Sequence, residues 1–577
     1  MKKKLLPALI VTGLIILVVI IMGITALINK YTPTKKTEDL KEYFNISSDD
    51  EAALIVNNEL SDYKAKIIDK KIYVDYKFVH DSLNSRFYWD ANENVLLYTT
   101  ASDIISAAAD SNSYSVTKQT NDFGYPIVKA TSDSALIALD YVKQYSNITF
   151  KSYDDPARIV ITSKWDEIDS ATVSKSTQVR VKGGIKSPIL KEVKKDDKIT
   201  ILDSGDKWDK VATEDGVIGY IKRKALSESK KTKLTNPDYE EETFTHIKKD
   251  KDICLAWNQV TSQSANSKVP QVISSTKGIN VMSPTWFYLN DNNGNLADIA
   301  SKDYVSYCHS QGIEVWGLFS NLENTDVDAA YVLTHTSTRT TLINQIMSAA
   351  FNYELDGVNI DFENITEAAY GDSYIEFIRE LAIKCHNNGI SLSVDVTVPA
   401  SFNKFFNRSD MAKFADYIVI MGYDEHYKGS DAGSVSSIPW VTEGVESTLK
   451  EVPADQIILG MPFYTRIWEL TPKEDDDAVT DTEDQSKYTV ASQVYSMDAA
   501  AAQLATNNAT AALDEESGQN YAEWSASNKL YKVWLEDSTS LEKRLKLVDD
   551  NKLAGAAFWK LGFENSFVWD TVIKYLD

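Results

Sequence analysis

The sequence predicts an α/β protein whose C-terminal region, residues 251–577, forms a (β/α)₈ (TIM) barrel. Apolar runs typical of buried strands alternate there with helical stretches over about 325 residues, a length that suits this fold. Informative polar and aromatic residues follow these runs, at the strand ends where such barrels place their active sites. A doubly wound sheet is the alternative fold, but no glycine-rich nucleotide loop opens the region. The predicted strands are 253–257, 279–283, 313–319, 357–363, 391–397, 417–423, 457–463 and 555–559.

An apolar helix is predicted at the N-terminus, over residues 1–30. Three lysines at positions 2–4 precede an uncharged run at 5–28, which is long enough to cross a bilayer. A cleavable signal peptide is the alternative, but its apolar core is shorter and is followed by a small-residue cleavage site, which is not found here. The lysines favour a cytoplasmic N-terminus. We therefore expect a single-pass protein of the cell membrane whose remaining residues lie outside the cell, on the wall side.

Residues 40–166 are predicted to form an α+β module with a weak internal repeat. Segments 87–90 and 95–99 match segments 152–154 and 159–162, and a helical stretch precedes each pair. This pattern resembles the small stalk module named after the N-terminal domain of copper amine oxidases. The resemblance implies a spacer and no copper. A plain α+β spacer is the alternative.

Residues 171–227 change to short strands separated by turn residues, at 178–181, 198–202, 208–211 and 216–221. Their order and length resemble a bacterial SH3 barrel, with Trp208 and the Gly219-Tyr220 strand as its marks. The resemblance implies a β-barrel that binds the cell wall through its peptides; a structural spacer without a ligand is the alternative. Residues 228–250 are charged and polar and are predicted to be a linker.

Charge and composition exclude several classes of function. The net charge of −24 argues against nucleic acid as a partner, because phosphate backbones are bound by basic patches. Three cysteines, at 254, 308 and 385, are too few for a disulfide framework and lack metal-ligand spacing. The six histidines are scattered. We therefore expect neither a metal nor another cofactor.

The predicted strand around residue 360 carries the acidic groups that point to chemistry. Side chains alternate between the two faces of a strand, so Asn359, Asp361 and Glu363 share one side, spaced about 7 Å apart. Apolar residues at 358, 360 and 362 share the other side and can pack under helices. Two acids on the inner face of a buried strand are costly unless they are hydrogen-bonded or take part in chemistry.

Four ordered motifs in this region resemble glycoside hydrolase family 18, the chitinase family. Residues 356–363 read DGVNIDFE and resemble its fourth-strand signature DGxDxDxE; MGYD at 421–424, GMPFY at 460–464 and FW at 558–559 resemble its sixth, seventh and eighth strands. The resemblance covers roughly residues 250 to 577. Segments 256–257, 283–286, 424–426 and 533–537 look most like the spore-cortex-lytic N-acetylglucosaminidases of the family. Those enzymes usually carry LysM modules, and this sequence shows none.

The resemblance implies hydrolysis assisted by the substrate, in which the 2-acetamido oxygen of the sugar attacks its own anomeric carbon. Glu363 then corresponds to the general acid and later base, and Asp361 to the group that orients the acetamide and balances the developing charge. Tyr423 would donate a hydrogen bond to the acetamido oxygen. The remaining candidates are substrate-binding residues: Asp424 for a sugar hydroxyl, Trp559 as the floor under the sugar, Met421, Tyr464, and Trp257 and Trp286 as further platforms or core residues.

Asn359 departs from the family pattern, which has its first and deepest aspartate at this position. An amide cannot take up a proton from its neighbour, but it can donate a hydrogen bond to Asp361 and hold it in place. We expect activity to survive with an altered pH profile.

About 90 residues, at 465–553, separate the last two predicted strands, more than a barrel helix needs. This stretch resembles the small α+β insertion that walls the substrate cleft in many family members. The favoured function is a membrane-anchored glycosidase that cuts β-1,4 bonds of N-acetylglucosamine-containing glycans, with peptidoglycan as substrate. The alternatives are a chitinase or endo-N-acetylglucosaminidase acting on exogenous glycans, and a carbohydrate-binding pseudoenzyme.

Overall fold

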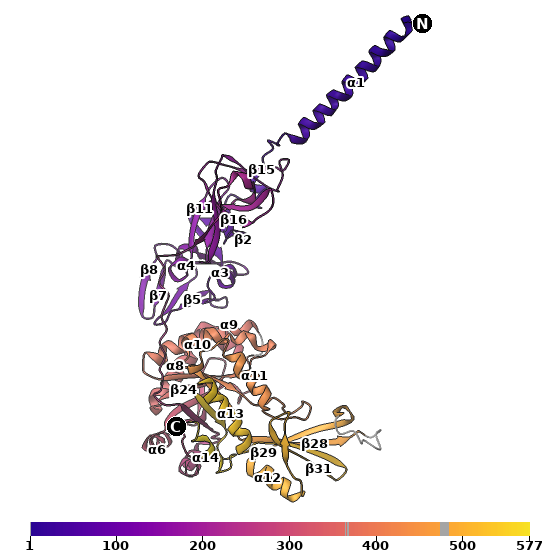
Figure 1. Cartoon of the computed structure of the whole chain (residues 1–577). Helices are drawn as coiled ribbons and strands as arrows, with labels where there is room; N and C mark the ends of the chain where they lie inside the picture. Colours follow the sequence, from indigo (N-terminus) through magenta and orange to yellow (C-terminus); the bar gives the residue numbers. More distant parts are fainter. Residues whose placement is uncertain (1, 364, 366–367, 474–483, 577) are drawn as a thin grey trace. The chain divides into compact units, whose positions relative to one another are not determined.

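The computed structural model describes residues 2–363, 365, 368–473 and 484–576 (Figure 1). The chain divides into two compact units. The first comprises Met1–Phe87, Ala107–Tyr114 and Asp122–Glu241. The second comprises Tyr88–Ser106, Ser115–Asn121 and Glu242–Asp577.

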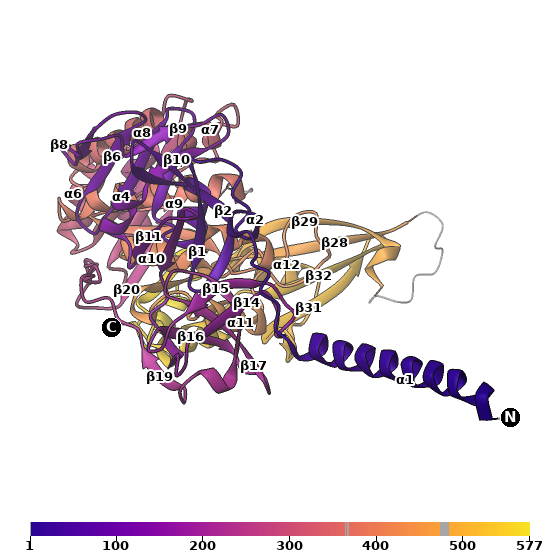
Figure 2. The same cartoon turned by 90° about the horizontal axis from the view of Figure 1, so that it is seen from above.

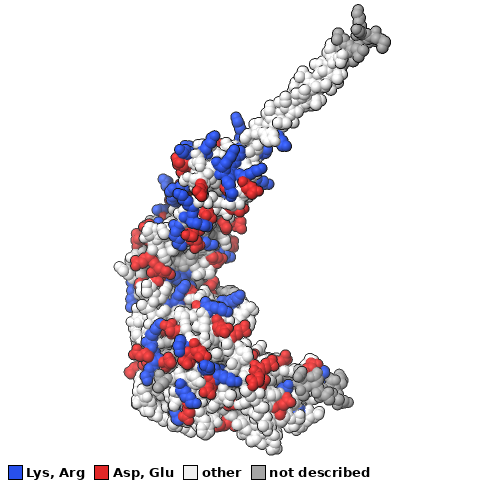
Figure 3. Space-filling model, in the orientation of Figure 1, with Lys and Arg blue, Asp and Glu red and all other residues white. Residues whose placement is uncertain are grey.

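Helix α1 (Lys2–Tyr31) is the apolar N-terminal helix that the sequence predicts. Its segment Leu9–Tyr31 has a mean hydropathy of 2.9 and is not buried against the rest of the described chain. Figure 3 shows an uncharged surface along the middle of this helix. By length and composition the helix suits a membrane span, and a signal sequence would share both properties.

The first unit contains a seven-stranded mixed sheet in the order β11-β12-β1-β2-β3-β10-β9. Helices α3 and α4 pack on strands β3 and β10 of this sheet. In both copies of the predicted repeat a helix precedes a hairpin, since α3 precedes β4 and β5, and α4 precedes β11 and β12. The family assignment of this module stays a prediction. The elements are β1 (Glu51–Val56), β2 (Glu59–Ile68), β3 (Lys71–Asp75), β9 (Val128–Ala130), β10 (Ala135–Ala138), β11 (Thr149–Tyr153), β12 (Arg158–Thr162), α2 (Leu40–Tyr43), α3 (Tyr76–Ser82) and α4 (Leu139–Tyr145). A separate five-stranded sheet has the order β4-β5-β6-β7-β8, with β4 (Phe87–Asp90), β5 (Val95–Thr99), β6 (Ile104–Ala108), β7 (Ser113–Val116) and β8 (Gln119–Asp122).

A second seven-stranded sheet in the first unit is antiparallel, in the order β15-β14-β18-β17-β16-β13-β19. The four strands that the sequence predicts here correspond to β14, β16, β17 and β18, and the SH3-like assignment stays a prediction. Residues 230–233, predicted as linker, instead form β19, because their backbone pairs with the edge of β13. The strands are β13 (Glu167–Thr172), β14 (Thr177–Arg180), β15 (Ile189–Val193), β16 (Lys198–Asp203), β17 (Trp208–Thr213), β18 (Ile218–Lys222) and β19 (Lys230–Lys233).

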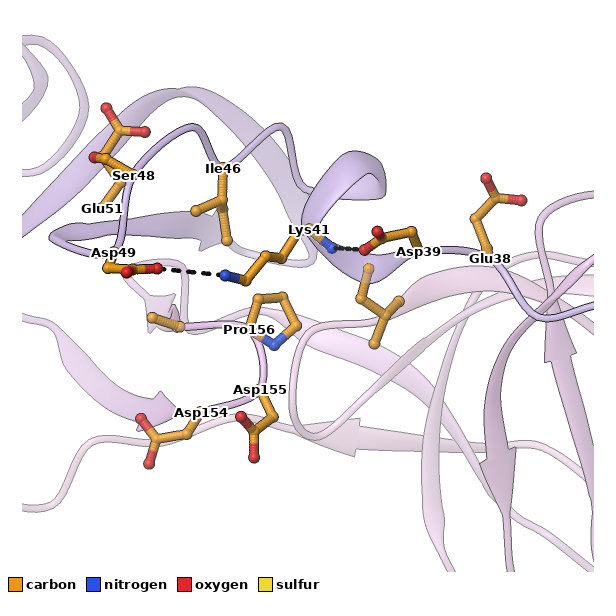
Figure 4. A pocket seen from close by; sticks show the side chains of 12 residues that line it. Glu38, Asp39, Lys41, Ile46, Ser48, Asp49, Glu51, Asp154, Asp155 and Pro156 are labelled. Atoms are coloured by element: carbon orange, nitrogen blue, oxygen red, sulfur yellow. Dashed lines mark hydrogen bonds and ion pairs between the residues drawn. The ribbon is translucent and has the colours of Figure 1, made fainter.

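The two sheets of the first unit share one apolar core. Phe44, Ala53 and Ile55 from the first sheet region pack with Val179 and Val211 of the second. A pocket of about 710 Å³ also lies in this unit, and half of its lining residues, from the segments 38–51 and 154–157, are acidic (Figure 4). The single lysine in its lining, Lys41, lies 3.4 Å from Asp49.

The second unit contains the closed barrel of eight parallel strands that the sequence predicts. Strand β20 pairs with both β21 and β33, which closes the ring. Inside it, Trp316 stacks on Tyr417 at 5.6 Å between ring centroids and fills the lower part of the barrel. The strands are β20 (Ile253–Asn258), β21 (Val281–Leu289), β23 (Glu314–Ser320), β24 (Gly357–Asp361), β25 (Ser391–Thr397), β26 (Tyr417–Met421), β27 (Ile457–Pro462) and β33 (Gly555–Trp559), with β22 (Leu296–Asp298) added antiparallel to β21.

Helices cover the outside of the barrel and bury the apolar faces of the strands. Helix α8 packs on β24, α9 on β25, α10 on β26 and α13 on both β27 and β33. All three cysteines are buried and free. The helices are α5 (Val269–Ile273), α6 (Lys302–Ser310), α7 (Ala329–Thr334), α8 (Thr336–Tyr353), α9 (Ala368–His386), α10 (Arg408–Phe414), α11 (Ile438–Thr448), α13 (Ser538–Asn551) and α14 (Val568–Val572).

The predicted α+β insertion is present between β27 and α13. It is a five-stranded antiparallel sheet in the order β29-β28-β32-β31-β30 with one helix, and Figure 2 shows it projecting from the barrel. Residues 474–483 of the insertion lie outside the described part of the chain. The elements are β28 (Tyr464–Pro472), β29 (Tyr488–Ser496), β30 (Ala512–Asp514), β31 (Gln519–Ala526), β32 (Lys529–Leu535) and α12 (Met497–Thr506).

Part of the predicted stalk module belongs to the barrel's unit. Asp90 is 1% exposed and accepts hydrogen bonds from Thr336 N at 2.7 Å and Thr336 Oγ1 at 2.6 Å, at the start of helix α8. The first N–H groups of a helix lack internal partners, and the helix's own N-cap residue, His335, supplies none from its side chain. Thr99 Oγ1 donates to Glu376 Oε1 at 2.7 Å in the neighbouring helix α9. The hairpin 88–99 therefore completes the barrel's helical layer.

Candidate active site

Strand β24 places the predicted acidic residues at the C-terminal rim of the barrel. Its first residue is a glycine because a Cβ at Gly357 would lie 2.5 Å from Cδ1 of Trp316, inside the barrel. On the outer face, Phe362 stacks on Phe377 of helix α9 at 5.6 Å. The inner face carries Asn359 and Asp361, as the alternation of the sequence predicts. Because the strand runs toward the C-terminal rim, Asn359 lies deeper in the barrel than Asp361.

Asn359 is fully buried, and both ends of its amide are hydrogen-bonded. Its Oδ1 accepts from Trp257 Nε1 at 2.9 Å and Ser283 Oγ at 3.0 Å. Its Nδ2 donates to Ser393 Oγ at 3.0 Å and Asp395 Oδ1 at 2.7 Å. The expectation that Asn359 donates to Asp361 is therefore wrong, because strand β25 takes both of its N–H groups.

Asp361 is 8% exposed, and its Oδ1 is buried without a hydrogen-bond partner among the residues that the structure describes. Loss of hydration raises the pKa of this carboxyl well above its usual range, and the carboxylates of Asp395, Glu363 and Glu323 raise it further. Both effects favour the protonated form of the Asp361 carboxyl group. An acetamide N–H can supply the missing hydrogen bond.

Glu363 follows the strand, and its side chain is exposed. Its backbone N–H donates to Asn321 Oδ1 at 3.1 Å, which fixes the residue against the end of β23. Neighbouring protein atoms remove part of its hydration, and this raises the pKa of Glu363, with Asp424 and Glu323 adding to the shift. A solvent-accessible carboxyl group with a raised pKa is suited to donate a proton to a ligand.

A cavity of about 290 Å³ lies beside Asn321, which accepts the backbone hydrogen bond of Glu363. Its lining includes Asn321 and Leu322 from the end of β23, and Ile365 and Tyr370 from the segment after β24. Ser320 Oγ donates to Glu323 Oε2 at 2.8 Å and places a further carboxylate at this end of β23. The rim around Glu363 is therefore acidic and hollowed on one side.

The sixth- and seventh-strand motifs supply the opposite side of the rim. Tyr423 follows β26, and burial together with the carboxyl groups at 361, 395 and 363 raises the pKa of its phenol well above the usual range. Its hydroxyl therefore keeps its proton and can act as a donor. Tyr464 donates to Asp424 Oδ1 at 2.6 Å, and Arg466 lies 3.7 Å from the same oxygen. These two contacts fix the orientation of the Asp424 carboxylate.

The predicted aromatic platforms divide into two groups. Trp559 is half-buried and lies edge-on to Trp257 at 5.9 Å. Trp257 is 1% exposed and Trp286 is fully buried, donating its Nε1 to Asn266 at 2.8 Å. Of the two alternatives left open for Trp257 and Trp286, burial favours core residues over sugar platforms, because neither offers a free face. Met421 is 8% exposed at the end of β26.

Several residues of the site escaped the sequence analysis: Ser283, Asn321, Glu323, Ser393 and Asp395. The segment SLSVDVT at 391–397 has the same alternation as β24, with buried apolar residues at 392, 394 and 396 on the helix side. That alternation was the available signal for Asp395. The others are single polar residues whose role depends on contacts between strands.

The described residues contain no group of three or more His, Cys, Asp or Glu side chains arranged to hold a metal ion. The candidate side chains at the rim are the carboxyl groups of Asp361, Glu363 and Asp424, the phenol of Tyr423 and the indole of Trp559. Two carboxyl groups with raised pKa values, one exposed and one buried and lacking a partner, are suited to acid–base work on a neutral ligand that carries an amide.

Comparison with known proteins agrees with this chemistry. The sequence model of the family described as Glycosyl hydrolases family 18 matches residues 319–564. The chain is 24% identical over 301 residues to the uncharacterized glycosylase YvbX of Bacillus subtilis, covering 49% of this chain and 81% of that protein. It is 25% identical over 287 residues to the cortical fragment-lytic enzyme of the same organism, covering 48% of this chain and 63% of that protein. Residues 319–564 of the second unit therefore match the glycoside hydrolase family 18 model, and these relatives support a glycoside hydrolase.

A solved structure supports the fold. The spore cortex-lytic enzyme SleL of Bacillus cereus is similar with a TM-score of 0.50 and 18% identity, covering 60% of this chain and 79% of that chain. At this identity the likeness concerns the barrel fold alone. The SH3-like and stalk-like modules have no counterpart in these matches.

Proposed function

We propose that this chain is a retaining glycosidase that hydrolyses β-1,4 bonds of N-acetylglucosamine-containing glycans by substrate assistance, and that its substrate is peptidoglycan. The observation that carries the proposal is the pairing of Glu363 and Asp361 at the end of β24. One carboxyl group is accessible and has a raised pKa, and the other is buried with an oxygen that has no hydrogen-bond partner among the described residues. The similarity to cortical fragment-lytic enzymes supports a wall glycan as the substrate.

In the first step the acetamido oxygen of the bound sugar attacks the anomeric carbon while the bond to the leaving oxygen breaks. Glu363 gives its proton to that oxygen, so the leaving sugar departs as a neutral alcohol. Asp361 accepts a hydrogen bond from the acetamide N–H and balances the positive charge of the oxazolinium ion. Tyr423 donates to the acetamido oxygen and aligns it for attack.

In the second step Glu363, now a carboxylate, takes a proton from water. The resulting hydroxide adds to the anomeric carbon and opens the oxazolinium ring. Two displacements at one carbon give overall retention. Asp424, held by Tyr464 and Arg466, would bind a sugar hydroxyl, and Trp559 would pack against the sugar's apolar face.

The substrate is tested by digesting purified peptidoglycan and, in parallel, chitin oligomers with the full chain in detergent. We expect mass spectrometry to show wall fragments with N-acetylglucosamine at the reducing end. The Glu363→Gln chain is the negative control, and its sedimentation with peptidoglycan reports wall binding by the other modules. Cleavage of chitin alone would replace peptidoglycan by chitin as the substrate.

We also propose that helix α1 anchors the chain in the cell membrane with the N-terminus inside and the barrel outside, and that residues 171–227 bind the wall. The uncharged length of the helix and the lysines before it support this topology. Protease added to intact cells should then remove the barrel from the cell fraction. Full protection of the barrel in intact cells, with digestion after lysis, would reverse the topology.

A further inference from the structure

Strand β25 brings a second buried carboxyl group beside Asp361. Asn359 pairs with Ser393 and Ile360 with Val394 in the parallel ladder of β24 and β25. The next position along both strands places Asp395 beside Asp361. Side chains of neighbouring strands in register point to the same face, so both carboxyl groups face the barrel interior. Asp395 is 2% exposed.

The hydrogen bonds of this pair are unequal. Asp395 Oδ1 accepts from Asn359 Nδ2 at 2.7 Å, whereas Asp361 Oδ1 has no partner among the described residues. An N–H donor stabilises the charged form of a carboxyl group, and burial without a donor favours the neutral form. Two neighbouring buried carboxyl groups oppose each other's ionisation, and Asp395 raises the pKa of Asp361 in this way. The resting arrangement is therefore a protonated Asp361 beside a carboxylate at Asp395.

We propose that Asp395 is a positioning residue that shares one proton with Asp361 and so supplies, from strand β25, the second carboxyl group that Asn359 cannot provide. When an acetamide N–H reaches Asp361, the O–H bond of Asp361 breaks and an O–H bond forms on Asp395. The pair keeps a single negative charge throughout. Asp361 becomes a carboxylate under the acetamide without releasing its proton to solvent. The catalytic consequence rests on the proposed function; the proton sharing does not.

The surrounding groups favour a pair with one proton. The carboxyl groups of Glu363 and Glu323 raise the pKa of Asp361, and that of Glu363 also raises the pKa of Asp395. Each of these neighbours therefore opposes a second negative charge on the pair. Burial raises the pKa of Asp395 well above its usual range, and the bond from Asn359 opposes that rise. Tyr423 and Tyr374 face the pair with phenols whose pKa values are themselves raised, so neither adds charge.

The first test measures the proton directly, without turnover. Infrared spectra of the full chain in detergent should contain a protonated-carboxyl band that Asp361→Asn removes. In Asp395→Asn the negative neighbour is gone, so the same band should titrate at a pH lower by about one unit or more. The exposed Asp303→Asn should leave the band unchanged. An unchanged titration in Asp395→Asn would overturn the proposal.

The second test measures catalysis and uses a swap. Asp395→Asn should lower kcat/KM at least about tenfold and shift its pH profile, because Asp361 loses the acceptor for its proton. The double variant Asn359→Asp/Asp395→Asn returns the second carboxyl group to β24 and should recover most of that loss. If Asp395 has a purely structural role, the single and the double variant should lower the unfolding temperature equally, and the double variant should not recover the wild-type pH profile. That result would contradict the proposal. A positive infrared result with a wild-type chain that turns over no glycan would instead refute the proposed function.

Discussion

Replacing Glu363 by Gln is expected to lower kcat/KM on an N-acetylglucosamine glycan by about a thousandfold or more, equivalent to about 4 kcal/mol of barrier. The amide has the same shape but carries no transferable proton, so the leaving oxygen would depart as an alkoxide. Glu363 is exposed and its only described hydrogen bond is made by its backbone N–H, so the fold should be unaffected. Turnover is measured with a fluorogenic or oligosaccharide substrate, and folding by circular dichroism.

The matched control for this variant is Glu354→Gln, an exposed glutamate that caps the C-terminus of helix α8, ahead of β24. It should retain wild-type turnover. The wild-type rate should also fall as pH rises through the raised pKa of Glu363, because only the protonated form can donate. If Glu363→Gln turned over substrate at the wild-type rate, Glu363 would not be the general acid. The same would follow if the residual activity of this variant fell at high pH as the wild-type activity does.

Asp361→Asn is expected to reduce kcat by about a hundredfold, or about 2.7 kcal/mol, with a smaller change in KM. An amide can still meet the acetamide N–H through its oxygen, but it cannot become negative when the oxazolinium ion forms. The lost interaction belongs to the transition state, which is why kcat should carry the effect. The measurement is a full kcat and KM determination on chitin oligomers and wall fragments.

The control for this second variant is Asp303→Asn, an exposed aspartate on helix α6. Because burial disfavours the charged form of Asp361, its replacement by a neutral group of equal size should not lower the unfolding temperature. A loss confined to KM would show that Asp361 binds the ground state only and would exclude charge stabilisation as its function.

The barrel strands could be predicted from the sequence because each is an apolar run that is followed by polar or aromatic residues. The alternation around Asp361 also predicted that Asn359 faces the barrel interior, where its amide is hydrogen-bonded. It could not predict the partners of Asn359, which come from β20, β21 and β25 and depend on the closure of the barrel. Local pattern does not encode contacts made at a distance of 30 to 100 residues.

The surroundings of Trp286 and Asp90 could not be predicted for the same reason, since they also depend on tertiary contacts. Trp286 follows a strand and looks like a rim residue, but its indole turns outward among Phe287 and Tyr304, where helices cover it. Asp90 ends the segment 87–90 of the predicted stalk module, yet it caps a helix 246 residues later in the chain. Whether a polar or aromatic residue meets solvent or a helix is decided by tertiary packing, which the linear sequence leaves open.

The configuration of the first product tests the central claim most directly. The full wild-type chain is mixed with a β-1,4-linked N-acetylglucosamine oligomer or wall glycan, and proton NMR follows the new reducing ends before they mutarotate. Substrate assistance by the acetamide, with Asp361 beneath it and Glu363 as acid, requires the β-anomer to appear first. Initial formation of the α-anomer would mean direct attack by water and would contradict the mechanism.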